Sequence, residues 1–536
     1  MRGFKRWMKR EDVECSDALH IFQSVESGGA PSISVKALCD LMEGDVVATI
    51  PKRSCLTVRT SAASPIVEES RLGGYLGLAV SLMYERSLGP QSRWFQYLQI
   101  LPSSEPIPLL WSLPEIDSLL CGTEIHKIVK EDKALVYQDW KECIKPLLSS
   151  ASLKLNPDFF TVDEYVAAKS LIASRSFQID EYHGYGMVPL ADLRAKPYML
   201  SDVFLLELTR KLEELYVISF FVNRMSLLCS MTSFNHKTAA EDVHFTSVSY
   251  CSESDVDSSN QKQDTDYKMY GDDEPVAQDS HLETGGFRSE LEFESSSTSG
   301  NDVMVMQMII CKDVKSGAEV FNTYGSLSNA ALLHRYGFTE PENPFDILNM
   351  DLEIVLQWSS SVFSCRHSRR RLSLWRKLGY SECDSQNSQY FEISFHGEPQ
   401  LELLVLLNII LLSEEAYHEL ELALLSVGNS KQITNRHVLE KYNFLIEKAT
   451  KLSKELLLTR NVCQALLSLA DAREHFFGPN SLQDDIKSLN ESCQAKEHKL
   501  YHSLMLRISE RRILKKLRSY AASGLKQLDK EKSERV

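Results

Sequence analysis

The sequence predicts an α+β fold: a core of short strands and small sheets with a helical insertion, followed by an all-α C-terminal domain. Short β-branched runs separated by turn residues occupy about 21–57, a pattern typical of strands. From about 70 to 164 this pattern gives way to helical periodicity, and long leucine-rich segments follow Asn343-Pro344-Phe345. We therefore place a first domain at 1–345, with its helical insertion at about 70–164, and a helical second domain at 346–536.

The first strands are predicted at Ile33–Val35 and Val46–Ile50. Met42–Asp45 separates them with turn residues, and Pro51 ends the second run. In the helical insertion, aromatic residues at helical spacing are expected to lie in the core rather than in a site. They include Trp94, Tyr97 and Trp111.

Two later segments of the first domain differ from their surroundings. Residues 201–221 have the pattern of an amphipathic helix that runs into an apolar stretch. Residues 252–300 are rich in serine, aspartate and glutamate and poor in apolar residues, so burial cannot offset the entropy lost on ordering. We predict a disordered acidic loop there.

The C-terminal helices are amphipathic and basic. One helical face is predicted to be apolar, formed by Leu506, Ile513, Leu517 and Tyr520. The other faces carry Arg511, Arg512, Lys515, Lys516 and Arg518. Further upstream, Arg366–Arg371 is either a solvated helix face or a nuclear-import or nucleic-acid patch.

Composition excludes several classes of function. The 536 residues carry a net charge of −15, which argues against wrapping nucleic acid and is compatible with a basic, lysine-bearing protein substrate. The 12 cysteines form no C-x-x-C pair, so we expect neither a zinc site nor a disulfide framework. No metal is therefore predicted.

No membrane segment is predicted either. The strongest apolar run, Leu403–Leu412, is interrupted by Asn408 and is about half the length of a membrane span. The basic N-terminus lacks the apolar core of a signal peptide and the serines of a transit peptide. We expect a nuclear or cytoplasmic protein.

The most specific pattern lies between Glu319 and Phe338. Two tyrosine–glycine pairs, Tyr324-Gly325 and Tyr336-Gly337, flank a short predicted helix at Asn329–Leu333. One such pair alone usually marks a packed aromatic before a turn. The whole string resembles the closing motif of the SET-domain methyltransferases, in particular the branch that includes the Rubisco large-subunit lysine methyltransferase. The strands near 33–51 and the C-terminal helices resemble the opening and the substrate-binding domain of the same branch.

The resemblance implies S-adenosylmethionine as cofactor and a protein lysine as substrate. Methyl transfer is an in-line displacement that requires oriented reactants, excluded water and a neutral amine. An apolar channel beside a positive sulfonium favours that neutral amine. By resemblance, Tyr324 is catalytic and contacts the cofactor, whereas Tyr336 is catalytic and lines the lysine channel or the cofactor face. The alternative for each is a packed aromatic at a turn.

Upstream residues complete the site by resemblance. Asn235 and His236 match the family's N-H pair, which grips the cofactor, although a lone histidine is more often structural. Arg175, in S-R-x-F, is expected to meet the cofactor carboxylate or the substrate, because a planar guanidinium binds carboxylates bidentately. Asp192, in P-x-x-D, is expected beside the N-H pair and the substrate. The family's glycine-rich opening corresponds to Glu26–Ser32.

This upstream string is interrupted. The family has D-L-x-N-H without a break, whereas 194–233 separates Asp192-Leu193 from Phe234-Asn235-His236. Removing 194–233 would restore the string, so we hypothesise an alternative translation product such as a retained intron. A genuine inserted helix, lid or partner-binding hairpin is the alternative, and sequencing the transcripts distinguishes the two.

The sequence thus predicts a monomeric S-adenosylmethionine-dependent protein-lysine N-methyltransferase that acts on a non-histone protein, for example a ribosomal one. No nucleic acid or membrane partner is expected. Two alternatives remain open: a protein-histidine methyltransferase, and a catalytically impaired splice form that serves as a protein-binding scaffold.

Overall fold

The chain divides into two compact units. The computed structural model describes residues 2–24, 32–150, 155–190, 241–249, 304–322, 324–380, 390–427, 454–493 and 497–534. The first unit comprises Met1–Glu105 and Gln138–Ser326, and the second comprises Pro106–Tyr137 and Leu327–Val536. The helical region at 70–164 is therefore shared between the units. The domain boundary at 345 stays a prediction, and the segments 194–233, 201–221 and 252–300 lie outside the described residues.

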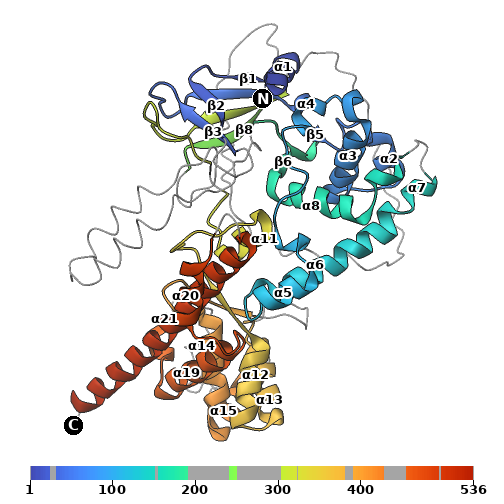
Figure 1. Ribbon diagram of the computed structural model, residues 1–536. Helices are drawn as coiled ribbons and strands as arrows, with labels where there is room; N and C mark the ends of the chain where they lie inside the picture. Colours follow the sequence, from blue (N-terminus) through green and yellow to red (C-terminus); the bar gives the residue numbers. More distant parts are fainter. Residues whose placement is uncertain are drawn as a thin grey trace, which may run out of the picture. The chain divides into compact units, whose positions relative to one another are not determined.

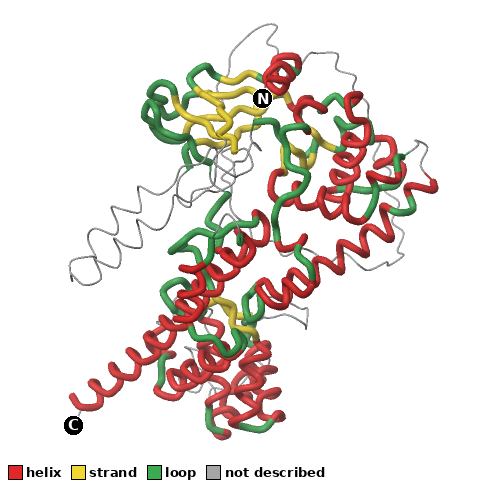
Figure 2. The backbone as a smooth tube through the Cα atoms, viewed as in Figure 1, coloured by secondary structure: helices red, strands yellow, loops and turns green. Residues whose placement is uncertain are grey.

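The described residues of the first unit form three small antiparallel sheets (Figures 1 and 2). The largest has the order β1 (Glu14–Cys15), β4 (Val46–Pro51), β9 (Met304–Ile310) and β8 (Val243–Ser249). A second pairs β2 (Leu19–Ser24) with β3 (Ser32–Ala37), and the third has the order β5 (Leu56–Thr57), β7 (Gly184–Met187) and β6 (Ser176–Asp180). The strands predicted at 33–35 and 46–50 are confirmed as β3 and β4.

The predicted turn between these two strands is also confirmed. The backbone N–H of Asp45 donates to the carbonyl oxygen of Met42 over 3.1 Å, and Gly44 has a φ of +91°. Glycine adopts this left-handed conformation without the steric cost that other residues pay. The turn moves the chain from one sheet to another, because β3 pairs with β2 whereas β4 pairs with β1 and β9.

Helices surround the sheets of the first unit. They are α1 (Arg2–Arg10), α2 (Ser64–Glu69), α3 (Gly74–Leu88), α4 (Phe95–Leu98), α7 (Leu147–Ser150) and α8 (Val162–Arg175). Figure 1 shows α3 beside α8, and the two helices pack directly against each other. Trp94 and Tyr97 are buried as predicted, and the ring of Tyr97 stacks on Trp7 with centroids 5.7 Å apart.

The second unit is mainly helical (Figure 2). Its segment from Pro106 contributes α5 (Leu113–Leu119) and most of α6 (Ile125–Asp139). The remainder contributes α11 (Asn329–Tyr336), β10 (Leu348–Asp351), α12 (Leu352–Val362), α13 (Cys365–Lys377), β11 (Tyr390–Ile393), α14 (Leu401–Leu411), α15 (Glu414–Val427), α18 (Lys454–Leu457), α19 (Arg460–His475), α20 (Leu482–Glu491) and α21 (His498–Glu534). Trp111 is buried here, as predicted, beside Leu506 of α21.

The strongest apolar run forms the centre of this second core. Helix α14 buries residues on all its sides, and the polar Asn408 is satisfied because its Nδ2 donates to the carbonyl oxygens of Leu404 and Leu457 over 2.8 and 2.9 Å. A buried amide must be paired in this way, since an unpaired one costs about 1–3 kcal/mol. In the described part of the chain, no helix combines the length and apolarity that crossing a bilayer would require.

Helix α21 buries apolar and charged residues together. Leu506, Ile513 and Leu517 are buried, as predicted. Arg511 was predicted on one of the charged faces outside the apolar face. It is instead buried, at 3% exposure, and donates to Asp485 over 2.5 Å. Helical periodicity alone could not indicate this buried ion pair, since Asp485 lies on a different helix, α20.

Candidate active site

The structure describes three of the six predicted site residues. Arg175 and Tyr324 belong to the first compact unit, and Tyr336 belongs to the second. Asp192, Asn235 and His236 lie outside the described residues.

The segment before Tyr324 is held along β3. The backbone N–H of Ala37 donates to the carbonyl oxygen of Ala318 over 2.9 Å, and that of Val320 donates to Val35 over 3.2 Å. An antiparallel bridge joins Lys36 to the residue between them. The closing motif thus begins as an added edge on the β2–β3 pair, which fixes its course up to Val320, four positions before Tyr324.

Asp242 anchors the same segment from the other side. Its backbone N–H donates to the carbonyl oxygen of Phe321 over 3.0 Å, and its Oδ2 accepts the N–H of Phe321 over 2.7 Å. Its Oδ1 pairs with Lys312 over 2.9 Å, and the residue is only 6% exposed. A buried carboxylate with two such partners, together with the backbone hydrogen bond, holds the chain firmly.

The backbone conformation after Tyr324 explains why a glycine follows this tyrosine. Gly325 has a φ of +94°, a conformation that L-residues rarely adopt. Tyr324 itself is partly exposed, so its ring is not enclosed in the core. This exposure is compatible both with a tyrosine that faces a ligand and with an aromatic ring packed at a turn, so the two roles of Tyr324 stay predictions.

Glu319 is the most unusual titratable residue of the motif. Its Oε1 is buried and has no hydrogen-bond partner among the described residues, and burial raises the pKa of its carboxyl to about 7, although Lys36 opposes the shift. The sequence motif contains this glutamate, but its spacing gave no sign that the side chain is desolvated. It lies five positions before Tyr324.

Arg175 ends α8 and is 7% exposed. Its Nε and one Nη donate to the same oxygen of Glu105, over 2.8 and 2.5 Å, and the backbone N–H of Glu105 donates to Ser170 over 3.0 Å. Glu105 therefore orients the guanidinium. A contact of Arg175 with cofactor or substrate stays a prediction.

Tyr336 is the last residue of α11. Ser328 caps the start of this helix by accepting the N–H of Ala331 over 3.3 Å, and Gly337 ends it with a φ of +77°. The predicted short helix at 329–333 is thus confirmed and is three residues longer. The Tyr336 ring lies 6.3 Å from that of Phe338, which is 5% exposed.

A buried polar pair holds the loop that follows this helix. The Nδ2 of Asn329 donates to Asp346 and to the carbonyl oxygen of Glu340, each over 2.8 Å, and its Oδ1 accepts the N–H of Glu340 over 2.7 Å. Asp346 also accepts from Ser509. The sequence pattern around Asn329 does not indicate this role, because its partner Asp346 lies 17 residues further on.

The chain is similar in sequence to several proteins named as lysine N-methyltransferases. It is 24% identical over 348 residues to "Ribosomal lysine N-methyltransferase 3" of Saccharomyces cerevisiae, a match that spans 59% of the chain and 58% of the yeast protein. It is 21% identical to "N-lysine methyltransferase setd6" of Xenopus laevis, over 78% of the chain and 74% of the frog protein. A chloroplast Rubisco large-subunit N-methyltransferase of Pisum sativum is 30% identical over 36% of the chain and 38% of its own length.

Solved structures agree on the fold. The crystal structure of the SET domain of LSMT bound to lysine and AdoHcy superposes with a TM-score of 0.57 at 18% identity, covering 99% of the chain and 92% of its own. A structure of Rubisco LSMT bound to AdoMet gives 0.56. No protein-family model matches the chain. The predicted α+β fold and the resemblance to the Rubisco type are confirmed.

Proposed function

We propose that this chain, a relative of the SET-domain protein-lysine methyltransferases with the fold of the Rubisco type, is an S-adenosylmethionine-dependent protein-lysine N-methyltransferase. The observation that carries the proposal is the similarity, over 78% of the chain, to an N-lysine methyltransferase. The substrate is a non-histone protein, the class to which the names of the ribosomal-lysine and Rubisco relatives point.

The described residues fit this cofactor in their chemistry. Arg175 offers a planar guanidinium, already oriented by Glu105, for a carboxylate. Tyr324 is only partly buried and stands on a backbone fixed by Asp242. Together with Asn235 and His236, these residues would hold S-adenosylmethionine, which supplies the methyl group when bound.

The tyrosines act on the lysine. Free lysine has a pKa of about 10.4, so its amine must be desolvated to lose a proton near neutral pH. The ring of Tyr324 would wall the channel, and its hydroxyl would hold the amine in line by a hydrogen bond without ionising. Tyr336 would line the channel, and Asp192 would contact the substrate.

The first experiment follows a labelled methyl group from S-adenosylmethionine into the proteins of a cell extract. The full chain is compared with a version lacking 194–233, and mass spectrometry identifies the modified residue. We expect N-methyl-lysine. Methyl-histidine alone would assign the chain to the histidine class. Failure of both versions to bind S-adenosylmethionine in calorimetry, with the second unit still folded, would favour the scaffold and overturn the proposal.

The second experiment changes Tyr324→Phe in the active version. Loss of the hydroxyl misplaces the amine, and an error of about 1 Å at such a site costs about a hundredfold in rate. Calorimetry should show nearly unchanged cofactor binding. Tyr182→Phe is the matched control, because Tyr182 is an exposed tyrosine of the same unit, at 61% exposure. Equal activity of both variants would remove Tyr324 from the mechanism.

A further inference from the structure

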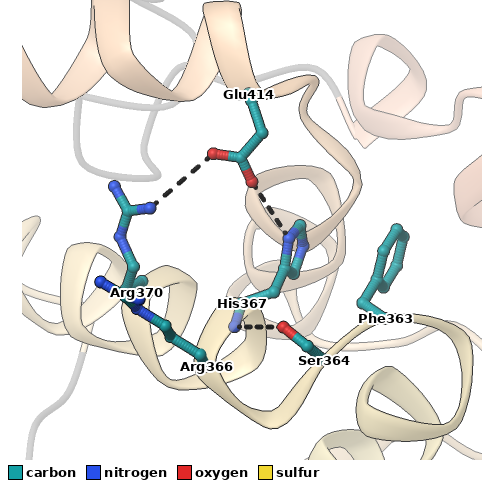
Figure 3. Close-up of a pocket in the computed structure, with 6 residues that line it drawn as sticks. All are labelled: Phe363, Ser364, Arg366, His367, Arg370 and Glu414. Atoms are coloured by element: carbon teal, nitrogen blue, oxygen red, sulfur yellow. Dashed lines mark hydrogen bonds and ion pairs between the residues drawn. The ribbon is translucent and has the colours of Figure 1, made fainter.

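The second unit has a surface pocket at the arginine-rich segment 366–371, and this pocket contains one glutamate, Glu414. It is a hollow of about 410 Å³ where α12 ends, α13 begins and α15 begins. Figure 3 shows the side chains that line it: Phe363, Ser364, Arg366, His367, Arg370 and Glu414. Its size suits one or two side chains of a bound peptide.

The glutamate of the pocket is already neutralised from within the protein. Its Oε1 accepts from Arg371 over 3.0 Å and lies 3.3 Å from Nδ1 of His367. Partial desolvation raises the pKa of Glu414, but Arg371, Arg370 and His367 outweigh this effect and the net shift is downward. Arg371 is 1% exposed, so it serves Glu414 and not the solvent.

Negative charge compensates two guanidinium groups at the rim only weakly. Arg366 is exposed, and among the described residues it has no ion-pair or hydrogen-bond partner. Arg370 approaches Glu414 and Glu421 only at 3.8 and 3.6 Å. The two arginines stand four positions apart on α13, where like charges repel across one helical turn. A carboxylate placed between them would relieve this repulsion.

The walls of the pocket are preorganised for such a ligand. The ring of Phe363 stacks on His367 with centroids 4.4 Å apart and an interplanar angle of 7°. His367 is held further because its Nε2 lies 2.9 Å from the carbonyl oxygen of Ile410. Arg370 packs over the ring of Tyr417 at 4.8 Å, which restricts its guanidinium to one region. Fixed side chains lose less entropy when a ligand binds.

The charge distribution favours a short acidic peptide over a nucleic acid. A protein of net charge −15 repels a long polyanion, whereas a short peptide feels mainly the charges within a Debye length of about 8–10 Å. A planar carboxylate also matches the guanidinium fork, and Glu414 would repel a phosphate dianion more strongly than a carboxylate.

We propose that this pocket, which we call the α13 pocket, binds a glutamate- or aspartate-bearing segment of a partner protein through Arg366 and Arg370. The binding needs no cofactor. It is therefore measured independently of methyl transfer, and its failure would leave the proposed function untouched.

Fluorescence anisotropy tests the α13 pocket on the full chain. The probe is a short labelled peptide of alternating glutamate and glycine, and the comparison peptides carry glutamine or phosphoserine in place of glutamate. We expect the glutamate peptide to bind, the glutamine peptide not to bind, and Arg366→Glu to weaken binding by about tenfold. Added salt should weaken it as well.

Arg369→Glu provides the matched control, because Arg369 is equally exposed on α13 but does not line the pocket. It should leave binding within about twofold, since screened charges outside the pocket contribute little. If Arg369→Glu weakened binding as much as Arg366→Glu, the effect would come from net charge alone, and the proposal would be overturned. Stronger binding of the phosphoserine peptide or of oligo-uridine, or no binding of the glutamate peptide, would overturn it too.

Discussion

Glu124 and Glu510 form a buried carboxyl pair whose charge should limit stability at high pH. The backbone N–H of Glu124 donates to Oε1 of Glu510 over 3.0 Å, and Oε2 of Glu124 is buried without a hydrogen-bond partner in the part of the chain that the structure describes. Burial, reinforced by Glu510, raises the pKa of Glu124 to about 8, although Arg473 opposes the shift. Burial likewise raises the pKa of Glu510 to about 7, again against Arg473.

The sign of the pH effect follows from proton binding. Between the unfolded value of 4.5 and the folded value of about 8, the folded state binds more protons than the unfolded state, so stability falls as pH rises through this window. Each pKa unit corresponds to about 1.4 kcal/mol. The free energy of unfolding should therefore fall by on the order of 3 kcal/mol between about pH 5.5 and pH 8. Glu124→Gln cannot ionise and should lose this dependence.

Hydrogen exchange at α6 and α21 measures opening of the second unit even when the two units unfold separately. We expect Glu124→Gln to match the wild type near pH 5.5 and to exceed it in stability near pH 8.5. Glu131→Gln is the matched control, since Glu131 is an exposed residue of the same helix. A difference between Glu124→Gln and wild type that is equal at both pH values would refute the reasoning.

Two further substitutions test other parts of the structure. Glu319→Gln should stabilise the first unit by about 1 kcal/mol near pH 8.5 and little near pH 5.5. The reason is that the glutamate ionises above its pKa of about 7, whereas glutamine cannot ionise. Equal melting curves of the variant and the wild type at about pH 8.5 would contradict this. Gly337→Ala should destabilise the second unit by about 2–4 kcal/mol in denaturant unfolding, because its φ is +77° and an added Cβ would lie 2.8 Å from the carbonyl oxygen of Pro106. Gly478→Ala has a similar φ with open space around it, so its smaller loss, about 1 kcal/mol, isolates the cost of the clash.

Local patterns predicted local structure well. Strands β3 and β4 and the turn at 42–45 were visible because alternation, β-branching and a glycine act over a few residues. Helix α11 was visible because a serine cap and a glycine end bracket it. Strands β6 and β7 were missed, since each is short and their sequence lacks clear alternation.

Long-range pairing was beyond these patterns. The grouping of 106–137 with the C-terminal helices involves partners that are distant along the chain, such as Arg473, which donates to the carbonyl oxygen of Gly122 over 2.7 Å. The anchoring role of Asp242 likewise depends on a partner 79 positions away. For the candidate site, the tyrosines and the glycines that follow them could be predicted from the sequence. The desolvation of Glu319 and the pairing of Arg175 with Glu105 could not, because both depend on residues that are distant along the chain.

The contact between Glu124 and Glu510 sets an order of events during synthesis. The two residues are 386 positions apart along the chain. A ribosome that adds about 5–20 residues per second needs about 20–80 s to pass from one to the other. Throughout that interval Trp111, Ile116 and Ile125 lack the late helix that covers them, because Leu506 of α21 belongs to the same cluster. The earliest helices of the second unit therefore cannot complete their packing until the last helix has been synthesised. A nascent chain stalled before α21 would expose this apolar surface to chaperones or to other chains.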